Sequence, residues 1–122
     1  MRVIVVGMGI GGAACTLALQ RCGIDVLVLE QAGELSEVGA GLQLSPNALR
    51  VLERLGIGDA LQACAVEPQA HLFKAWDSGE TLLRTPLMPA VRETFAAPYY
   101  HAHRADLLAL LTGAVEGHRV RL

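Results

Sequence analysis

A glycine-rich hexapeptide near the N-terminus constrains the fold of this chain more than any other feature. Residues 7–12 read GMGIGG, which is the pattern G-x-G-x-x-G. The hexapeptide follows the apolar run 3–6 and opens a stretch with helical spacing of apolar residues over 10–21. A second apolar run, 26–29, leads to Glu30. This order predicts a β-α-β unit with a right-handed crossover, and an acid at the end of its second strand is typical of dinucleotide binding.

Each position of the hexapeptide has a physical role in that prediction. Gly7 allows a sharp turn out of the strand, and Gly9 lets a pyrophosphate approach the backbone because it has no Cβ. Gly12 lets the helix lie close to the sheet. The helix start, at Ile10 and Gly11, offers free N–H groups and a partial positive charge to phosphates.

Glu30 completes the expected nucleotide site. Its carboxylate can accept hydrogen bonds from both hydroxyls of an adenosine ribose. The negative charge should repel a 2′-phosphate, so NADP is disfavoured in this pocket.

Composition narrows the remaining classes of protein. The chain has 122 residues, which is one domain at most. Its hydrophobic fraction is 52%, as expected for buried parallel strands and for an unfinished domain whose apolar faces expect more chain. Lys and Arg number 10 against 12 acidic residues, without blocks of either sign, so we expect no nucleic-acid partner. No apolar run reaches the roughly 18 residues of a membrane span, and no signal peptide is present, so the expected location is cytoplasmic.

The middle of the chain departs from a plain dinucleotide-binding fold. Gly33 and the Gly-Ala-Gly run at 39–41 predict an irregular loop, followed by a short strand at 42–44. Ser45 is expected to cap a helix whose first position is Pro46.

The second half of the chain adds a β-hairpin. Two extended runs within 69–84 surround Asp77-Ser78-Gly79, which predicts a hairpin with a three-residue loop. A leucine-rich helix is expected over 105–116, and 118–122 resembles the start of a further strand. The hairpin would thus interrupt a doubly wound sheet between its second and third parallel strands, where a nicotinamide dehydrogenase would usually carry a helix and a strand.

Histidines and cysteines suggest no metal site. The three cysteines have no metal-ligand spacing. We expect His101 and His103 to face opposite sides of an extended segment and to form no metal site with the other histidines. Tyr99 and Tyr100 are interpreted as packing residues.

Three segments together resemble the class A flavoprotein monooxygenases, and most closely the salicylate hydroxylase and 6-hydroxynicotinate 3-monooxygenase group. The first segment is the glycine hexapeptide with Glu30-Gln31. The second is GAGLQLSPNA at 39–48, and the third is YYHAHRADLL at 99–108. The resemblance implies an α/β fold in which 1–122 is the N-terminal part of a Rossmann-like FAD-binding domain. The remainder of that domain, and most of a substrate domain, would be absent.

The resemblance also implies roles for individual residues. Gln43 would lie near the isoalloxazine and the substrate; it is the one weak catalytic candidate, and no acid–base role carries over to a glutamine. Arg104 would reach the FAD phosphate and ribityl region, a task that suits a guanidinium fork. The FAD-binding set implied by the resemblance is Gly7, Gly9, Ile10, Gly11, Gly12, Glu30, Gln31, Gln43 and Arg104.

The implied activity is hydroxylation of a small phenolic or salicylate-like aromatic substrate. FAD would be the cofactor, NADH or NADPH the transient reductant and O₂ the co-substrate, with a flavin C4a-hydroperoxide as the oxygenating species. A homodimer is the candidate assembly, no membrane partner is implied, and residues 1–122 alone are expected to lack activity.

Two other classes fit part of the pattern. An NAD-binding dehydrogenase or reductase domain would share the glycine fingerprint and Glu30, but it would not explain the 39–47 segment, the hairpin and Arg104. A non-catalytic, truncated nucleotide-binding module would explain the high apolar content.

Overall fold

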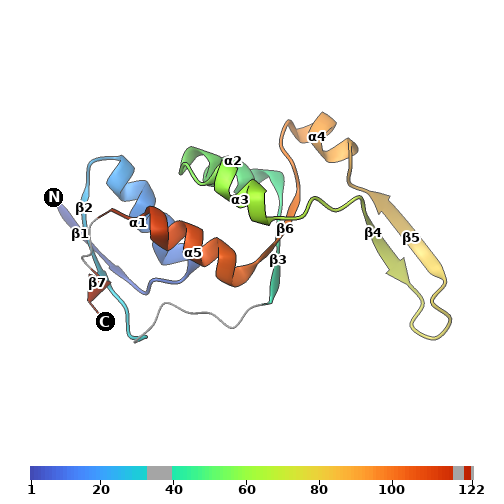
Figure 1. Cartoon of the computed structure of the whole chain (residues 1–122), viewed down its shortest axis with the longest axis horizontal. Helices are drawn as coiled ribbons and strands as arrows, with labels where there is room; N and C mark the ends of the chain where they lie inside the picture. The colour runs from blue at the N-terminus through green and yellow to red at the C-terminus, as the bar shows by residue number, and fades with distance from the viewer. Residues whose placement is uncertain (33–39, 117–119, 122) are drawn as a thin grey trace.

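The computed structural model describes residues 1–32, 40–116 and 120–121. Gly33 and Gly39 of the expected loop therefore lie outside the described residues, as do positions 117–119 and 122. Figure 1 shows a helical body with a small sheet at one end and a hairpin that projects from the other end.

The N-terminal β-α-β unit has the expected bounds. Strand β1 (Arg2–Val6), helix α1 (Ile10–Arg21) and strand β2 (Asp25–Leu29) follow one another, and β1 pairs with β2 in parallel. Strand β7 (Val120–Arg121) pairs with β2, also in parallel, which gives the order β1-β2-β7. The predicted α/β fold with a third parallel strand after the hairpin is confirmed.

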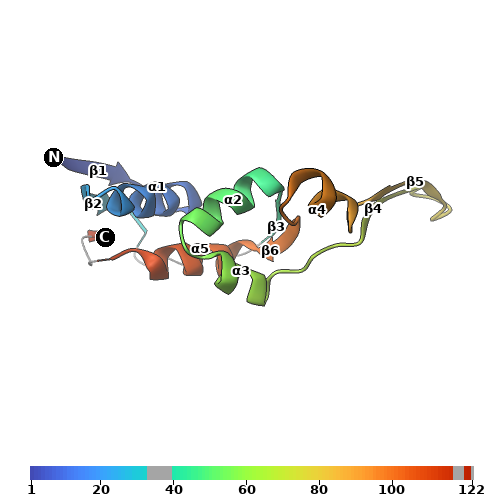
Figure 2. The same ribbon diagram turned by 90° about the horizontal axis from the view of Figure 1, so that it is seen from above.

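The main core lies between this sheet and the helices. Helix α1 packs against β2 and against helix α5 (Arg104–Ala114), as Figure 2 shows from above. Thr16 is fully buried on α1, although it is polar. The apolar residues buried at these contacts are Ala13, Leu17, Val26, Val28, Leu107, Leu108 and Leu111.

A second, antiparallel ribbon joins two distant segments of the chain. Strand β3 (Gly41–Leu44) pairs with strand β6 (Tyr100–His103), and Gln43 lies directly opposite His101. Because residues two apart in a strand share a face, the expectation that His101 and His103 face opposite sides is wrong. The other face of the ribbon meets the core, through Leu42, Leu44, Tyr100 and Ala102.

Three short helices lie between β3 and β6 in the sequence: α2 (Pro46–Arg54), α3 (Gly58–Cys64) and α4 (Ala90–Phe95). Ser45 stands at the N-cap position of α2, but its hydroxyl donates to Asn47 Oδ1 at 2.5 Å and caps no backbone N–H. The predicted helix start is thus confirmed and the predicted capping bond is wrong. Within the described ranges, no helix has the length and apolar character needed to cross a bilayer.

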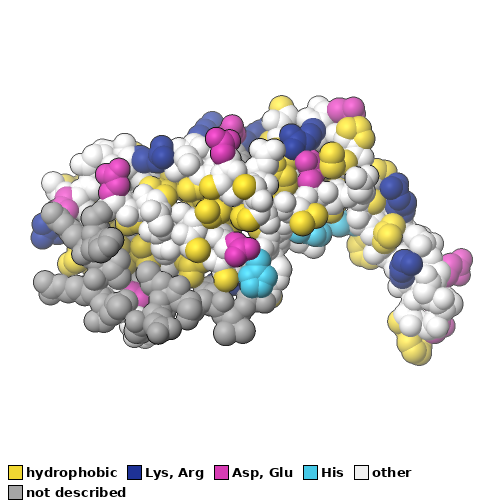
Figure 3. Space-filling model, viewed as in Figure 1, with side chains coloured by type: hydrophobic (Ala, Val, Ile, Leu, Met, Phe, Trp, Pro, Cys, Tyr) yellow, Lys and Arg dark blue, Asp and Glu magenta, His cyan; other side chains and the backbone are white. Residues whose placement is uncertain are grey.

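The predicted hairpin is formed by strands β4 (Ala70–Lys74) and β5 (Thr81–Pro86). The N–H of Ala75 donates to the Glu80 carbonyl at 2.8 Å, so the loop is one residue longer than expected. Figure 3 shows the hairpin standing away from the body. Several large apolar side chains on it are exposed: Leu72, Phe73, Trp76, Leu82 and Leu83.

Candidate functional site

The glycine-rich turn connects β1 to α1 and is tied to the end of β2. Gly7 has a φ of +90°, and its N–H donates to the Leu29 carbonyl at 2.7 Å. A Cβ at Gly12 would lie 1.9 Å from the Gly7 carbonyl oxygen. The fold itself therefore requires glycine at positions 7 and 12, because the first needs a left-handed backbone and the second a close approach.

Gly9 and Gly11 differ from these two glycines. A Cβ at either position would meet nothing within 4 Å. The Gly9 backbone, with φ −66° and ψ −177°, is open to any residue. Glycine at Gly11 costs helix stability relative to alanine. The structure of the chain gives no reason for glycine at these two positions, whereas a ligand that approaches the backbone would.

The first turn of α1 is open to an anion. In the described part of the chain no side chain caps this helix, and its first turn carries no acidic residue. The helical hydrogen bonds begin where the Ala13 N–H donates to the Gly9 carbonyl at 2.9 Å. The N–H groups of Ile10, Gly11 and Gly12 therefore precede the first N–H that has an acceptor within the helix, and there the helix dipole adds positive potential.

Glu30 closes the other side of the turn. Its Oε2 accepts a hydrogen bond from the Met8 N–H at 2.5 Å, and its Oε1 accepts one from the Ala32 N–H at 2.8 Å. These backbone donors, Met8 first, lower the pKa of the carboxyl group below its usual value. A carboxylate has about four acceptor positions, so two ribose hydroxyls can still bind. Gln31 lies exposed beside it.

Arg104 is placed at the start of α5, the helix that packs beside α1. Its backbone N–H donates to the Ala40 carbonyl at 3.1 Å, which ties the helix start to β3. A positive side chain in the first turn is unfavourable for a helix dipole. Helix stability therefore does not explain an arginine here.

Gln43 lies on the outward face of the β3–β6 ribbon, within a cluster that sequence reasoning missed. The Tyr99 hydroxyl donates to Gln43 Oε1 at 2.8 Å. The Tyr99 ring meets His71 and His101 edge-on, at centroid distances of 5.5 and 5.8 Å. His71 comes from the hairpin strand β4, and no local pattern in the sequence signals its approach to β6.

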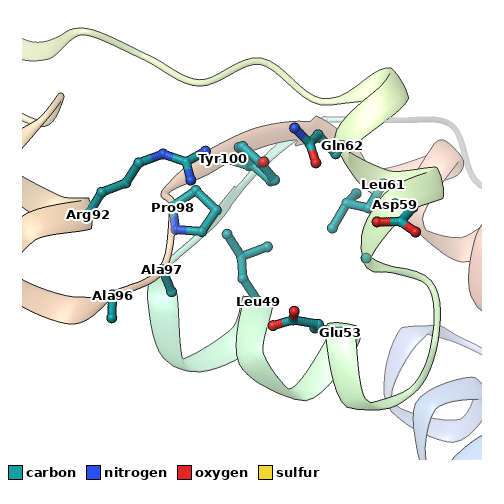
Figure 4. Close-up of a pocket in the computed structure, with 11 residues that line it drawn as sticks. Leu49, Glu53, Asp59, Leu61, Gln62, Arg92, Ala96, Ala97, Pro98 and Tyr100 are labelled. Carbon is teal, nitrogen blue, oxygen red and sulfur yellow. The ribbon is translucent and has the colours of Figure 1, made fainter.

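Two hollows lie away from the glycine turn. The first, of about 260 Å³, is drawn in Figure 4 and is lined by residues such as Glu53, Asp59 and Tyr100. Arg92 at its edge is held by both carboxylate oxygens of Glu67, at 2.6 and 2.8 Å, which raises the pKa of Arg92. The second hollow, of about 460 Å³, is mostly apolar and reaches Tyr99. None of the residues predicted for the FAD site lines either hollow.

Comparison with known proteins shows the family to which the chain belongs. A family model described as an FAD binding domain matches residues 1–111. The chain belongs to this family. Its turn, Glu30 and the open first turn of α1 fit the adenosine and pyrophosphate part of FAD, and the family match favours FAD over NAD.

Relatives of this FAD-binding domain are named as aromatic monooxygenases. The chain is 43% identical to 3-amino-4-hydroxybenzoate 2-monooxygenase of Streptomyces cremeus, over 100% of this chain and 31% of the relative. It is 39% identical to 6-hydroxynicotinate 3-monooxygenase of Pseudomonas fluorescens, over 93% of this chain and 30% of the relative. The chain thus spans about a third of the length of the curated relatives it matches.

A solved structure extends the comparison to the backbone. HpxO of Klebsiella pneumoniae, complexed with FAD and uric acid, matches with a TM-score of 0.87 and 27% identity, over 99% of this chain and 30% of that one.

The described residues of the FAD-binding domain contain no group of three His, Cys, Asp or Glu side chains that would hold a metal ion.

Proposed function

We propose that the protein carrying this chain is an FAD-dependent monooxygenase that hydroxylates a small aromatic substrate, and that this chain binds the ADP half of FAD. The observation that carries the proposal is the pair Gly9 and Gly11, which the fold leaves free to be other residues and which front an open helix start. The family match and the names of the relatives support the assignment.

Each residue has a binding task in this proposal. Gly9, Gly11 and the first N–H groups of α1 would receive the pyrophosphate, because the glycine backbone is open and the helix dipole favours negative charge. Glu30 would accept the ribose hydroxyls while it keeps its bonds to the backbone. Arg104 would add a charge-assisted hydrogen bond to a phosphate.

Oxygen chemistry would come from the cofactor, because FAD, when bound, activates O₂ for transfer to an aromatic ring. NADH or NADPH would supply the electrons. This chain would orient the cofactor and keep the adenosine end fixed. Gln43 would donate a hydrogen bond at the flavin or substrate.

The substrate class we propose is a hydroxylated aromatic acid. The relatives described above are named for an aminohydroxybenzoate and a hydroxynicotinate. Both compounds combine an aromatic ring, an electron-donating hydroxyl and a carboxylate. An electron-donating hydroxyl or amino group, ortho or para to it, activates the ring carbon that receives oxygen.

The test uses the intact protein. Its visible absorption spectrum reports bound flavin, and oxidation of NADH or NADPH is followed with 3-hydroxybenzoate, salicylate or 6-hydroxynicotinate. Under ¹⁸O₂ the expected product carries one labelled oxygen atom. Flavin without stimulated oxidation would confine the proposal to FAD binding, and a colourless protein that takes up no added FAD would overturn it.

A further inference from the structure

The side-chain amide of Gln43 is held from one side only. The Tyr99 hydroxyl donates to its oxygen at 2.8 Å, and among the described residues its nitrogen has no partner. A glutamine amide carries both an acceptor oxygen and a donor NH₂ group, and the way it is flipped decides which of them faces a given direction. With the oxygen engaged by a hydroxyl hydrogen, Gln43 presents its two N–H bonds outward.

Tyr99 is itself fixed by two imidazole rings. His71 meets it at 81° and His101 at 65°, both as edge contacts. The two imidazoles lie nearly parallel to each other, 17° apart, with centroids separated by 6.1 Å. Figure 3 shows histidine side chains at the concave junction between the body and the hairpin. Such a setting restricts the tyrosine ring and therefore the position of its hydroxyl oxygen.

Two buried imidazole nitrogens reduce the stability of this cluster, and packing alone does not explain why they are there. The Nε2 atoms of His71 and His101 are buried without a hydrogen-bond partner in the described part of the chain. Unpartnered buried nitrogens are rare and destabilising, so a cluster that retains them calls for an explanation other than stability. The hydrogen bond from Tyr99 to Gln43 gives the cluster a role other than stability, because it fixes the direction in which the amide points.

We propose that Tyr99 is a positioning residue, which acts through Gln43 to present an N–H donor to an oxygen acceptor on the ligand. The acceptor is a carboxylate, phenolate or carbonyl oxygen. The identity of the ligand rests on the proposed function, whereas the fixed orientation of the amide does not.

Order of the amide is tested first, in the intact protein labelled with ¹⁵N at glutamine side chains. The Gln43 signal is identified by its loss in Gln43→Leu. Tyr99→Phe keeps the ring and its contacts with the imidazoles but removes the hydroxyl, so we expect a more mobile Gln43 amide. Tyr100→Phe is the matched control, because this tyrosine lies on the opposite, buried face of β6. It should leave the amide signal unchanged.

The next test asks whether Tyr99 acts through Gln43. Binding of 3-hydroxybenzoate is followed through the flavin absorbance, and KM and kcat are measured. We expect Tyr99→Phe to weaken binding by about two- to tenfold and to raise KM more than it lowers kcat. In the Gln43→Leu background, Tyr99→Phe should weaken binding by less than about twofold, because the effects of substitutions at interacting residues are not additive. Gln43→Glu, which replaces the donor with an acceptor, should weaken binding of the carboxylate more than Gln43→Leu does.

The outcomes separate the two proposals. An equally ordered amide in Tyr99→Phe, or an equal loss of binding in both backgrounds, would overturn the positioning role and leave the proposed function standing. A loosened amide in a protein that hydroxylates none of these aromatic acids would uphold the positioning role and count against the proposed function.

Discussion

The carboxylate of Glu30 accepts a hydrogen bond from the backbone N–H of Met8 at 2.5 Å, and so links the end of β2 to the glycine turn after β1. The same carboxylate is the proposed ligand of the adenosine ribose. If the proposal holds, ordering of the turn and binding of the nucleotide depend on one side chain, and substitutions of Glu30 should affect both.

Glu30→Ala should weaken FAD binding by about tenfold or more, since it removes ribose hydrogen bonds and loosens the turn. Titration of the apoprotein with FAD, followed by quenching of flavin fluorescence, measures the loss. Glu80→Ala, in the hairpin loop, is the matched control and should bind FAD like the wild type. Equal affinity for Glu30→Ala and wild type would show that this carboxylate does not hold the ribose.

Acid should destabilise the protein through the same side chain. The backbone donors Met8 and Ala32 lower the folded-state pKa of Glu30 below its usual value of 4.5. The unfolded state therefore binds the proton more readily, and the contribution of Glu30 is present above about pH 4.5 and lost as pH falls through the folded pKa. Urea unfolding of wild type and Glu30→Gln between pH 3 and 6 measures it. A pH slope that is unchanged in the variant would contradict the assignment.

The two kinds of glycine in the turn should respond differently to alanine. Gly9→Ala should keep the stability of the apoprotein and lower FAD affinity, since its Cβ meets nothing in the chain but occupies the space proposed for the pyrophosphate. Gly12→Ala should destabilise the fold by about 1–3 kcal/mol or more, because its Cβ collides with the Gly7 carbonyl. Thermal unfolding and FAD titration of both variants separate these effects. Full FAD affinity in Gly9→Ala would show that the pyrophosphate does not bind against Gly9.

Arg104→Ala should lower FAD affinity by roughly 10- to 100-fold, the range expected for a charge-assisted hydrogen bond to a phosphate. Arg104→Lys should recover only part of it, because the ammonium lacks the planar fork. Arg54→Ala, an exposed arginine at the end of α2, serves as the control. A loss of the same size in Arg54→Ala would show that the effect comes from the change in net charge and not from a contact of Arg104 with FAD.

Local patterns predicted the parts of the fold that depend on neighbours in sequence. The bounds of α1 follow from helical spacing, and the presence of the hairpin, though not its loop length, follows from the turn residues, because both elements form from adjacent segments. Within α1 the spacing of apolar residues does not identify the buried face. Ala18 is exposed, whereas the polar Thr16 is fully buried. A stripe of small apolar residues does not fix which side of a helix the core takes.

Local sequence patterns could not predict which distant segments of the chain pair with each other. The β3–β6 ribbon aligns Gln43 with His101, and the hairpin brings His71 to the same place. No spacing rule relates these positions, because their meeting depends on how two elements pack in three dimensions. The glycine turn and Glu30 were predictable as a candidate site, whereas the surroundings of Gln43 required the structure.

The parallel pairing of β2 with β7 has a consequence for how the chain folds. Val28 and Val120 become neighbours in the sheet although most of the chain separates them. Closing so long a loop costs conformational entropy before any contact repays it, so this pairing raises the contact order of the fold. The β1-α1-β2 unit needs only local contacts and can form early. The backbone amides that pair β7 with β2 should therefore be the last in the nucleotide-binding scaffold to gain protection from hydrogen exchange during refolding.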